Sequence, residues 1–186
     1  MKIFPIHLQH DSMQCGITCL QMICEYYGRK YTLDQLAEMC YATTEGISLL
    51  GISQAAENIG IHAVCGRLTV KQLTPEALPC ILHWNQNHFV ILYRVKRKKY
   101  YLADPGKGRV QMEEEEFTTH WISTKSQGED KGIAMILSPT PEFYSQKGRC
   151  EKRESFAFLW SYLRQYHKYF FQIFCGLLLG CILQLI

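Results

Sequence analysis

Several motifs that would direct an interpretation are absent from this chain of 186 residues. It has no G-x4-G-K-[ST] motif, so nothing in it predicts ATP binding. Its nine cysteines form no CxxC pair and no zinc-finger spacing, so no metal site or other cofactor is expected. The 20 basic and 17 acidic residues give a net charge of only +3, without the clustering on one face that nucleic-acid binding needs. No nucleic acid is therefore expected as a partner.

The N-terminus also lacks a signal peptide, because the apolar run in residues 1–11 is too short. Scattered cysteines in a chain without an export signal are typical of a reducing cytosol. We therefore interpret the nine cysteines as free thiols. The hydrophobic content of 47% is enough for one sizeable core, which predicts a single globular domain with a tail.

The most informative stretch is 9–28, in which a glutamine precedes a Cys-Gly pair and an amphipathic pattern. Apolar residues recur at three- and four-residue steps after Gly16, and Gly28 stands where a helix commonly ends. The pattern predicts a helix with Cys15 at its first turn. The unpaired N–H groups and the dipole at a helix start stabilise a thiolate, so Cys15 is a candidate nucleophile. The alternative is a buried structural cysteine, which is the commoner role.

The rest of the first 60 residues predicts two more helices, one opened by a Thr32–Gln35 capping box and one running from Ser48 to Gly60. From His62 the pattern changes to short strands separated by turns. Strands are expected at 62–68, 80–84, 88–95, 99–105, 108–112 and 133–137, with a helical turn from 113 to 121 and a polar loop over 123–132. Helices followed by an antiparallel sheet predict an α+β fold, with a helical layer packed on the sheet.

The C-terminal part has a different composition. Residues 1–140 are expected to form the domain and 141–154 a linker, and 155–186 an amphipathic juxtamembrane helix with the start of a truncated transmembrane helix. Tyr169–Ile186 are 18 residues without a charge, the lower limit for crossing a bilayer. The basic residues before them place 1–168 in the cytoplasm by the positive-inside rule. A helix packed on the core is the alternative, although the lack of a polar face disfavours it.

A nucleophilic cysteine needs a base, a group that orients the base, and donors for the oxyanion. His88 opens one predicted strand and Asp104 ends the next, so an antiparallel pair would make them neighbours. A hydrogen bond from Asp104 would fix the His88 tautomer and leave the other ring nitrogen facing Cys15. Gln9 can donate its amide to the oxyanion. Each residue also has a simpler interpretation: an ordinary strand histidine, a turn aspartate before Pro-Gly, a solvated glutamine.

These residues carry a resemblance to a known family. The motifs in question are Gln9-x5-Cys15-Gly16, Leu20 to Tyr26-Tyr27-Gly28, Gly46-x-Ser48-Leu49-x-Gly51, His83-Trp84-x3-His88-Phe89-Val90 and Ala103-Asp104-Pro105. Together they resemble the bacteriocin-processing cysteine peptidase domain, which forms the N-terminus of ABC transporters that handle double-glycine leaders. The resemblance covers Ile3–Pro139.

The resemblance implies a papain-like fold with Cys15 as nucleophile, His88 as base, Asp104 as orienting group and Gln9 as oxyanion donor. It also implies a precursor peptide as substrate, cut after a leader that ends in a Gly-Gly type motif, and an apolar surface for the leader helix, for which Leu49 and Leu50 are candidates. The parent would be a homodimeric exporter of the bacterial inner membrane with its peptidase on the cytoplasmic side. Its ATP would bind a nucleotide-binding domain absent from this chain.

Two departures from the family and two other classes of function stay open. The family usually has Asp before the nucleophile, where this chain has Gln14, and the polar stretch Ser123–Lys131 is longer than usual. A non-cleaving leader-binding module of a secretion transporter is the main alternative, although such a module has no need of the cysteine. A thiol redox protein is disfavoured because Cys19 is expected to point into the core and no CxxC is present.

Overall fold

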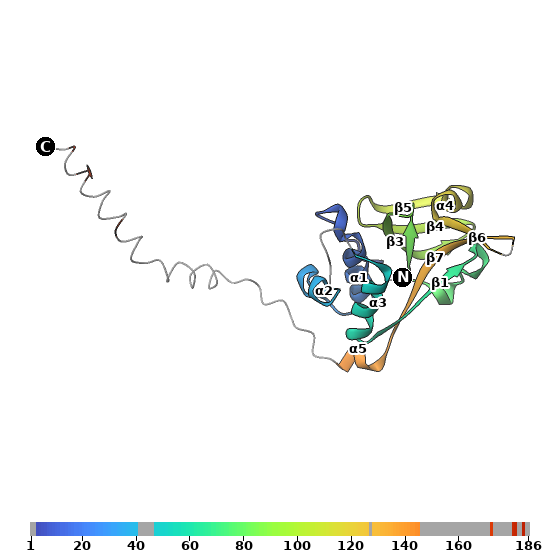
Figure 1. The fold of residues 1–186 in the computed structure, drawn as a ribbon, viewed down its shortest axis with the longest axis horizontal. Coiled ribbons are helices and arrows are strands. Elements are labelled where there is room, and N and C mark those ends of the chain that lie inside the picture. The colour runs from blue at the N-terminus through green and yellow to red at the C-terminus, as the bar shows by residue number, and fades with distance from the viewer. Residues whose placement is uncertain are drawn as a thin grey trace. The chain divides into compact units, whose positions relative to one another are not determined.

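The computed structural model describes residues 3–40, 47–126 and 128–145, together with Gln172, Gly180, Cys181 and Gln184. The chain divides into two units, 1–148 and 149–186. In the first unit, helices come first and a sheet follows (Figure 1). The predicted α+β class with a helical layer on an antiparallel sheet is confirmed.

Each of the three N-terminal helices begins and ends near the predicted residue. The helical elements are η1 (Ser12–Gln14), α1 (Cys15–Tyr26), α2 (Leu33–Met39), α3 (Leu49–Asn58), η2 (Val70–Gln72), η3 (Pro75–Ala77), α4 (Glu114–Trp121) and α5 (Pro141–Ser145). The capping box of Thr32 and Gln35 opens α2, and the Ser48 hydroxyl accepts the Gly51 N–H at 3.1 Å. Gly28 follows α1 with φ +98°, a conformation that favours glycine at a helix C-terminus.

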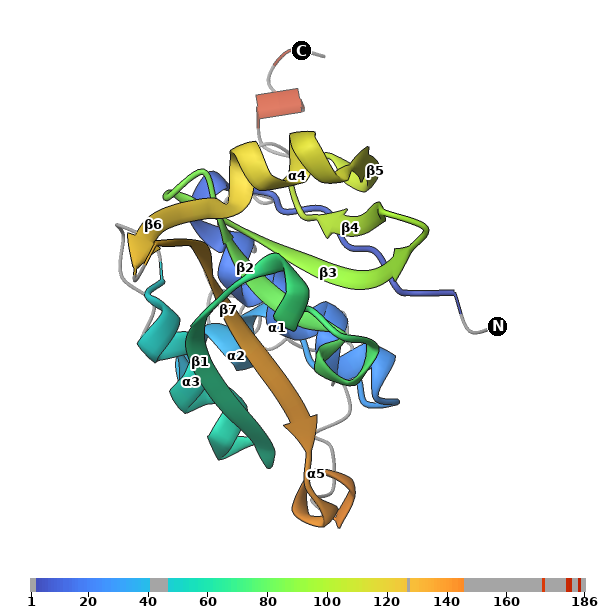
Figure 2. The same cartoon turned by 90° about the vertical axis from the view of Figure 1, so that its right-hand side faces the viewer.

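Seven strands form one antiparallel sheet in the order β1-β7-β2-β3-β4-β5, with β6 paired to β7. They are β1 (Ile61–Leu68), β2 (Cys80–Trp84), β3 (His88–Lys96), β4 (Lys99–Asp104), β5 (Gly108–Glu113), β6 (Ile122–Ser126) and β7 (Glu129–Pro139). Because side chains alternate along a strand, the sheet presents two apolar faces. Figure 2 shows α1, α2 and α3 on one side of the sheet and α4 on the other.

Two buried clusters fill these interfaces. Ile81 and Ile91 pack on the helical side, in one cluster with Leu20 of α1. The neighbouring strand residues point to the opposite face, where Val90 belongs to the cluster that contains Trp121 of α4. Consecutive strand residues thus divide between two cores, and β3 is held on both faces.

The prediction of a polar loop over 123–132 is wrong. These residues form the β6–β7 hairpin, which turns through Gly128 at φ +78°. Strand β6 pairs on only one side, and its side chains are half-buried or exposed, so it has no apolar alternation that a sequence pattern can detect. Backbone pairing forms the strand where the side chains give no signal.

The chain beyond residue 140 also differs from its expected description as a linker. Pro141–Ser145 form α5, and Phe143 is fully buried in the cluster on the helical side of the sheet. The compact unit therefore extends past the expected boundary. The juxtamembrane helix and the transmembrane segment are expected over 155–186. Except for four isolated positions, these residues lie outside the described part of the chain. Among the residues that are described, no helix has the length and apolar character needed to cross a membrane.

Candidate active site

Cys15 is the first residue of α1 and is buried, with 6% of its surface exposed. Its neighbour Gly16 lets the start of α1 approach α3 closely. A Cβ atom on Gly16 would lie 2.5 Å from Ile47 and 2.7 Å from Ile52, nearer than packed atoms tolerate. The thiol is thus fixed where the free N–H groups of the helix start are available.

His88 is the first residue of β3 and follows a tight turn. Asn85 and Gln86 have φ of 49° and 61°, and the Asn87 N–H donates to the Trp84 carbonyl at 3.2 Å, which is the geometry of a type I′ hairpin turn. The turn is attached to α4, because the Asn85 N–H donates to the His120 carbonyl at 3.0 Å and their side chains lie 2.8 Å apart. These contacts fix where His88 enters the strand.

Asp104 ends β4 beside His88, as the predicted strand pairing requires. Its Oδ1 lies 2.7 Å from His88 Nε2 and accepts the Gly106 N–H at 2.8 Å. Asp104 is 6% exposed, one of two buried polar residues in the described chain, the other being Thr18. A buried carboxylate needs such partners, and the histidine is one of them.

The charges of this pair depend on one another. Burial opposes the charged form of His88, but hydrogen bonds to Asp104 and to the Cys15 side chain outweigh it and raise the pKa of His88 to about 9. Burial likewise opposes the Asp104 carboxylate, while the hydrogen bonds from His88 and Gly106 lower the pKa of Asp104 below its usual value. At neutral pH the pair is therefore an imidazolium and a carboxylate.

Gln9 reaches the same place from the N-terminal segment. Its N–H donates to the Pro105 carbonyl at 2.9 Å, next to Asp104, and its side-chain oxygen is buried without a hydrogen-bond partner among the described residues. Gln9, His88 and Asp104 together line an open hollow of about 370 Å³. The four predicted site residues thus meet: Cys15 contacts His88, and the other three share this hollow.

Cys15 and His88 contact each other, whereas Cys19 and His62 have other partners. Cys19, one turn along α1, is fully buried; burial raises its pKa, and its thiol lies 3.4 Å from the Phe89 carbonyl. Every cysteine in the described part of the chain is a free thiol, as predicted there. His62 pairs with Glu57, far in sequence from the site. Within the described residues, no group of His, Cys, Asp and Glu could hold a metal ion.

Sequence reasoning found the strand ends but missed the residues that support them. Trp84 appears in the family motif without a role, yet it lines the hollow beside His88. The contact between Asn85 and His120 joins residues 35 positions apart, and only the docking of α4 brings them together. Gln14 makes no side-chain cap of α1, and its side-chain oxygen is buried without a partner in the described chain.

Comparisons with known proteins identify relatives of this chain. Residues 3–126 match the model of the Peptidase C39 family. The chain is 34% identical to the probable microcin-H47 secretion/processing ATP-binding protein MchF of Escherichia coli, over 76% of the chain and 19% of that protein. It is 33% identical to the colicin V secretion/processing ATP-binding protein CvaB of the same species, again over 76% of the chain and 19% of that protein. The chain thus spans about a fifth of the length of these relatives.

Solved structures give the same result. A double glycine motif protease from an AMS/PCAT transporter, crystallised in complex with the leader peptide, is 35% identical and superposes with a TM-score of 0.64. That alignment covers 73% of this chain and 91% of the other. The peptidase domain of Streptococcus ComA, at 23% identity and a TM-score of 0.61, shares the fold over 74% of this chain and all of the other.

Proposed function

Since this chain belongs to the Peptidase C39 family, we propose that it is a cysteine endopeptidase that removes the leader of a secreted peptide precursor after a Gly-Gly type motif. The observation that carries the proposal is the contact of Cys15, at the start of α1, with His88, which Asp104 holds at 2.7 Å. A histidine bonded to a carboxylate through one ring nitrogen keeps the other nitrogen directed at the nucleophile. A cysteine that served only packing would need neither partner.

Each residue then has a role in the reaction. His88 holds the proton of the Cys15 thiol as an imidazolium, and the Cys15 thiolate attacks the carbonyl carbon of the peptide bond. The negative oxygen that forms is stabilised by the Cys15 N–H and the Gln9 amide. The C–N bond breaks as His88 returns the proton to the leaving amine. Water, activated by His88, then hydrolyses the thioester and regenerates Cys15, so the reaction needs no cofactor.

The choice of a leader peptide as substrate is supported by the relative that was crystallised with one. That structure matches 73% of this chain at 35% identity, which is close enough to support a shared class of substrate. The proposed catalytic residues all lie within residues 3–126, which match the family model. The substrate of this chain is accordingly a precursor whose leader ends in two small residues.

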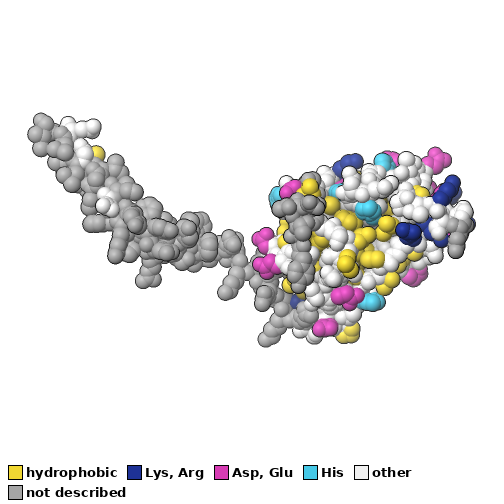
Figure 3. All heavy atoms as spheres, viewed as in Figure 1, with side chains coloured by type: hydrophobic (Ala, Val, Ile, Leu, Met, Phe, Trp, Pro, Cys, Tyr) yellow, Lys and Arg dark blue, Asp and Glu magenta, His cyan; other side chains and the backbone are white. Residues whose placement is uncertain are grey.

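A leader helix with an apolar face needs an apolar surface beside the site. Of the two candidates from the sequence, Leu50 is 66% exposed and Leu49 packs against the buried cluster. Hydrophobic side chains gather on the face shown in Figure 3, between the helices and the sheet. We assign the leader helix to an apolar surface of the helical layer, with the exposed Leu50 of α3 as one contact.

The names of the relatives support a setting for the peptidase. The two Escherichia coli proteins are described as secretion/processing ATP-binding proteins, and this chain matches a fifth of each. We propose that the peptidase acts with an ATP-driven exporter at the cytoplasmic side of the bacterial inner membrane. Attachment through 155–186 and a homodimeric parent remain predictions about residues outside the described part.

Cleavage of a synthetic precursor tests the proposal. The 186-residue chain is incubated with a panel of precursors that carry different double-glycine leaders, and the products are identified by mass spectrometry. We expect a cut after the Gly pair that Cys15→Ala abolishes. Cys19→Ala is the matched control, because it removes a buried thiol one helical turn away and should retain cleavage. If both proteins bind the leaders and neither cuts any of them, the chain is a leader-binding module instead.

A further inference from the structure

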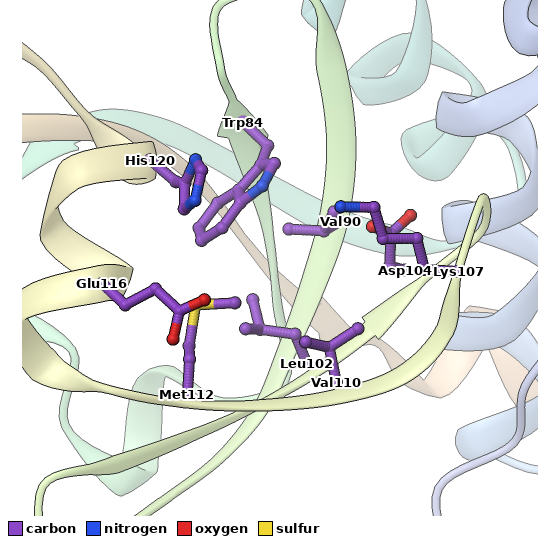
Figure 4. Close-up of a pocket in the computed structure, with 9 residues that line it drawn as sticks. All are labelled: Trp84, Val90, Leu102, Asp104, Lys107, Val110, Met112, Glu116 and His120. Carbon is purple, nitrogen blue, oxygen red and sulfur yellow. The ribbon is translucent and has the colours of Figure 1, made fainter.

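The α4 side of the sheet contains a cavity of about 80 Å³ that the proposed reaction does not use. Figure 4 shows the side chains around it, which come from α4, from strands β2 to β5 and from the β4–β5 turn. Its apolar wall comes from the sheet and includes Val90, Leu102 and Val110, while polar side chains surround this wall. Glu116 and His120 of α4 complete the opposite wall.

This cavity adjoins the candidate active site. Trp84, Asp104 and Lys107 line both the cavity and the open hollow that contains His88. Figure 4 places Asp104 and Lys107 at one end of the cavity and Glu116 at the other. Because the two spaces share three residues, a peptide bound in the hollow can place a side chain in the cavity.

The chemistry of the proposed reaction decides which part of the substrate lies there. The nitrogen of the broken bond receives a proton from His88, so it must lie within hydrogen-bond reach of that ring. The carbonyl oxygen is directed instead at the N–H of Cys15. The segment after the cleaved bond therefore leaves on the His88 side, where the hollow leads to Asp104 and Trp84.

We propose that this cavity binds one aliphatic side chain from the first two residues after the cleaved bond, and thereby selects how the released peptide begins. The inference rests on the proposed function, because it takes Cys15 and His88 as the reacting groups. It assigns selectivity to the released part of the substrate, in addition to the leader.

The size and charge of the cavity define the side chain that fits. A cavity of about 150 Å³ accepts benzene, so about 80 Å³ suits valine or leucine better than an aromatic ring. Two carboxylates, Asp104 and Glu116, line it against one ammonium group, that of Lys107. An acidic side chain is disfavoured because its charge would lose water in so small a space.

A series of precursors tests this selection. All carry one leader that the chain cleaves, and they differ only at the first or the second residue after the Gly pair, which is Gly, Ala, Val, Leu, Phe or Asp. The ratio of kcat/KM values is measured by competition in one reaction. At one of the two positions we expect Val or Leu to exceed Gly by about tenfold, the usual gain when a fitting apolar group fills a pocket. Phe and Asp should fall below Val.

Two variants alter the cavity itself. Val110→Phe fills it from β5 and should bring the Leu-to-Gly ratio close to one. Met112→Ala enlarges it from the same strand and should shift the preference from Val toward Phe. Val64→Phe is the matched control, since Val64 is 52% exposed on β1 at the other edge of the sheet, and its ratio should equal that of the unaltered chain.

The outcomes separate this inference from the proposed function. If no leader in the panel supports cleavage, the proposed function fails and the inference fails with it. If the unaltered chain cuts every precursor at the same rate, the peptidase stands and the cavity has no part in selection. A preference that survives both Val110→Phe and Met112→Ala also overturns the inference, because it must arise elsewhere.

Discussion

His88 Nε2 lies 2.7 Å from Asp104 Oδ1, and this contact joins the first residue of β3 to the last residue of β4. The pairing holds an imidazolium against a buried carboxylate, and it raises the pKa of His88 to about 9 although burial alone would lower it. The same contact, with that of Gly106, keeps the pKa of Asp104 low. Site geometry and fold stability are therefore coupled through two residues.

The coupling predicts a pH dependence of stability. The raised pKa of His88 contributes stability that is complete below about pH 6.5, the value for an unfolded histidine, and is lost as pH rises through about 9. The lowered pKa of Asp104 contributes stability above about pH 4 that is lost in more acidic solution. We expect Asp104→Asn to lower the Tm most between about pH 4 and 6.5, and progressively less toward pH 9.

Thermal unfolding of both proteins across this range measures the effect. Asp130→Asn is a suitable control, since Asp130 is an exposed carboxylate on β7 whose partner is Lys125. Exposed pairs of this kind contribute little to stability. A Tm difference for Asp104→Asn that widens from pH 6.5 to pH 9 would contradict the prediction.

The helices and the strand ends were predictable because their signals are local. Thr32 and Gln35 are three residues apart and cap α2 by themselves. His88 and Asp104 are neighbours because two strands joined by a short turn must pair, and the turn residues mark where each strand begins and ends. A pattern of a few residues is sufficient in both cases.

The parts that sequence reasoning missed depend on distant contacts. Strand β6 has no apolar alternation in its sequence. Backbone pairing with β7 holds it in place, and this pairing leaves no pattern in the side chains. The cavity near Asp104 exists because α4 packs over the sheet at a distance that places Glu116 opposite Val110. The orientation of a helix across a sheet is decided by packing of the whole core, which no local pattern contains.

The exposure of Leu50 predicts its role in binding the leader. Leu50→Glu places a charge on the exposed side of α3 without disturbing the core, because the side chain is 66% exposed. We expect the Kd for a leader peptide to rise by about tenfold, from the loss of a buried leucine and the desolvation of a charge. The Tm should change little.

Binding is measured by fluorescence anisotropy with a labelled leader and the Cys15→Ala chain, which prevents cleavage. Tyr144→Glu is the control: Tyr144 is 58% exposed on α5, a different helix from α3, and its substitution should leave the Kd unchanged. Equal weakening by both substitutions would indicate a general charge effect, and the leader helix would then need another surface.

The close approach of α1 and α3 predicts that Gly16 tolerates no side chain. In Gly16→Ala the new methyl group would lie 2.5 Å from Cγ2 of Ile47, a branch close to the backbone, and 2.7 Å from the fully buried Ile52. Overpacking of this kind costs about 1–3 kcal/mol, more than alanine gains over glycine in a helix. Gly66→Ala in β1 is the control, since a Cβ there meets nothing within 4 Å.

Urea denaturation measures both variants. Gly16→Ala should have a lower midpoint than the unaltered chain, and Gly66→Ala an equal or higher one, because alanine is preferred to glycine in a strand. Two variants with the same midpoint would mean that α3 moves away at no cost, and that Cys15 is held less firmly than the packing indicates.

The turn before His88 predicts a stabilising substitution. Gln86 has φ of 61°, a left-handed conformation that costs a residue with a Cβ about 1–2 kcal/mol. Asparagine followed by glycine is the preferred pair for a type I′ turn, and Asn85 already occupies the first position. We therefore expect Gln86→Gly to raise the free energy of unfolding by about 0.5–1 kcal/mol, after the greater entropy of glycine in the unfolded chain is subtracted.

Gln111→Gly is the matched control for this prediction, since Gln111 is exposed in the middle of β5 and adopts no left-handed conformation. There the same change should lower the free energy of unfolding by about 0.5–1 kcal/mol. Opposite signs from one substitution at two exposed glutamines would locate the strain in the turn itself. Equal destabilisation would show that Gln86 makes side-chain contacts whose loss outweighs the relief, and that these contacts, together with Asn85 and His120, position His88.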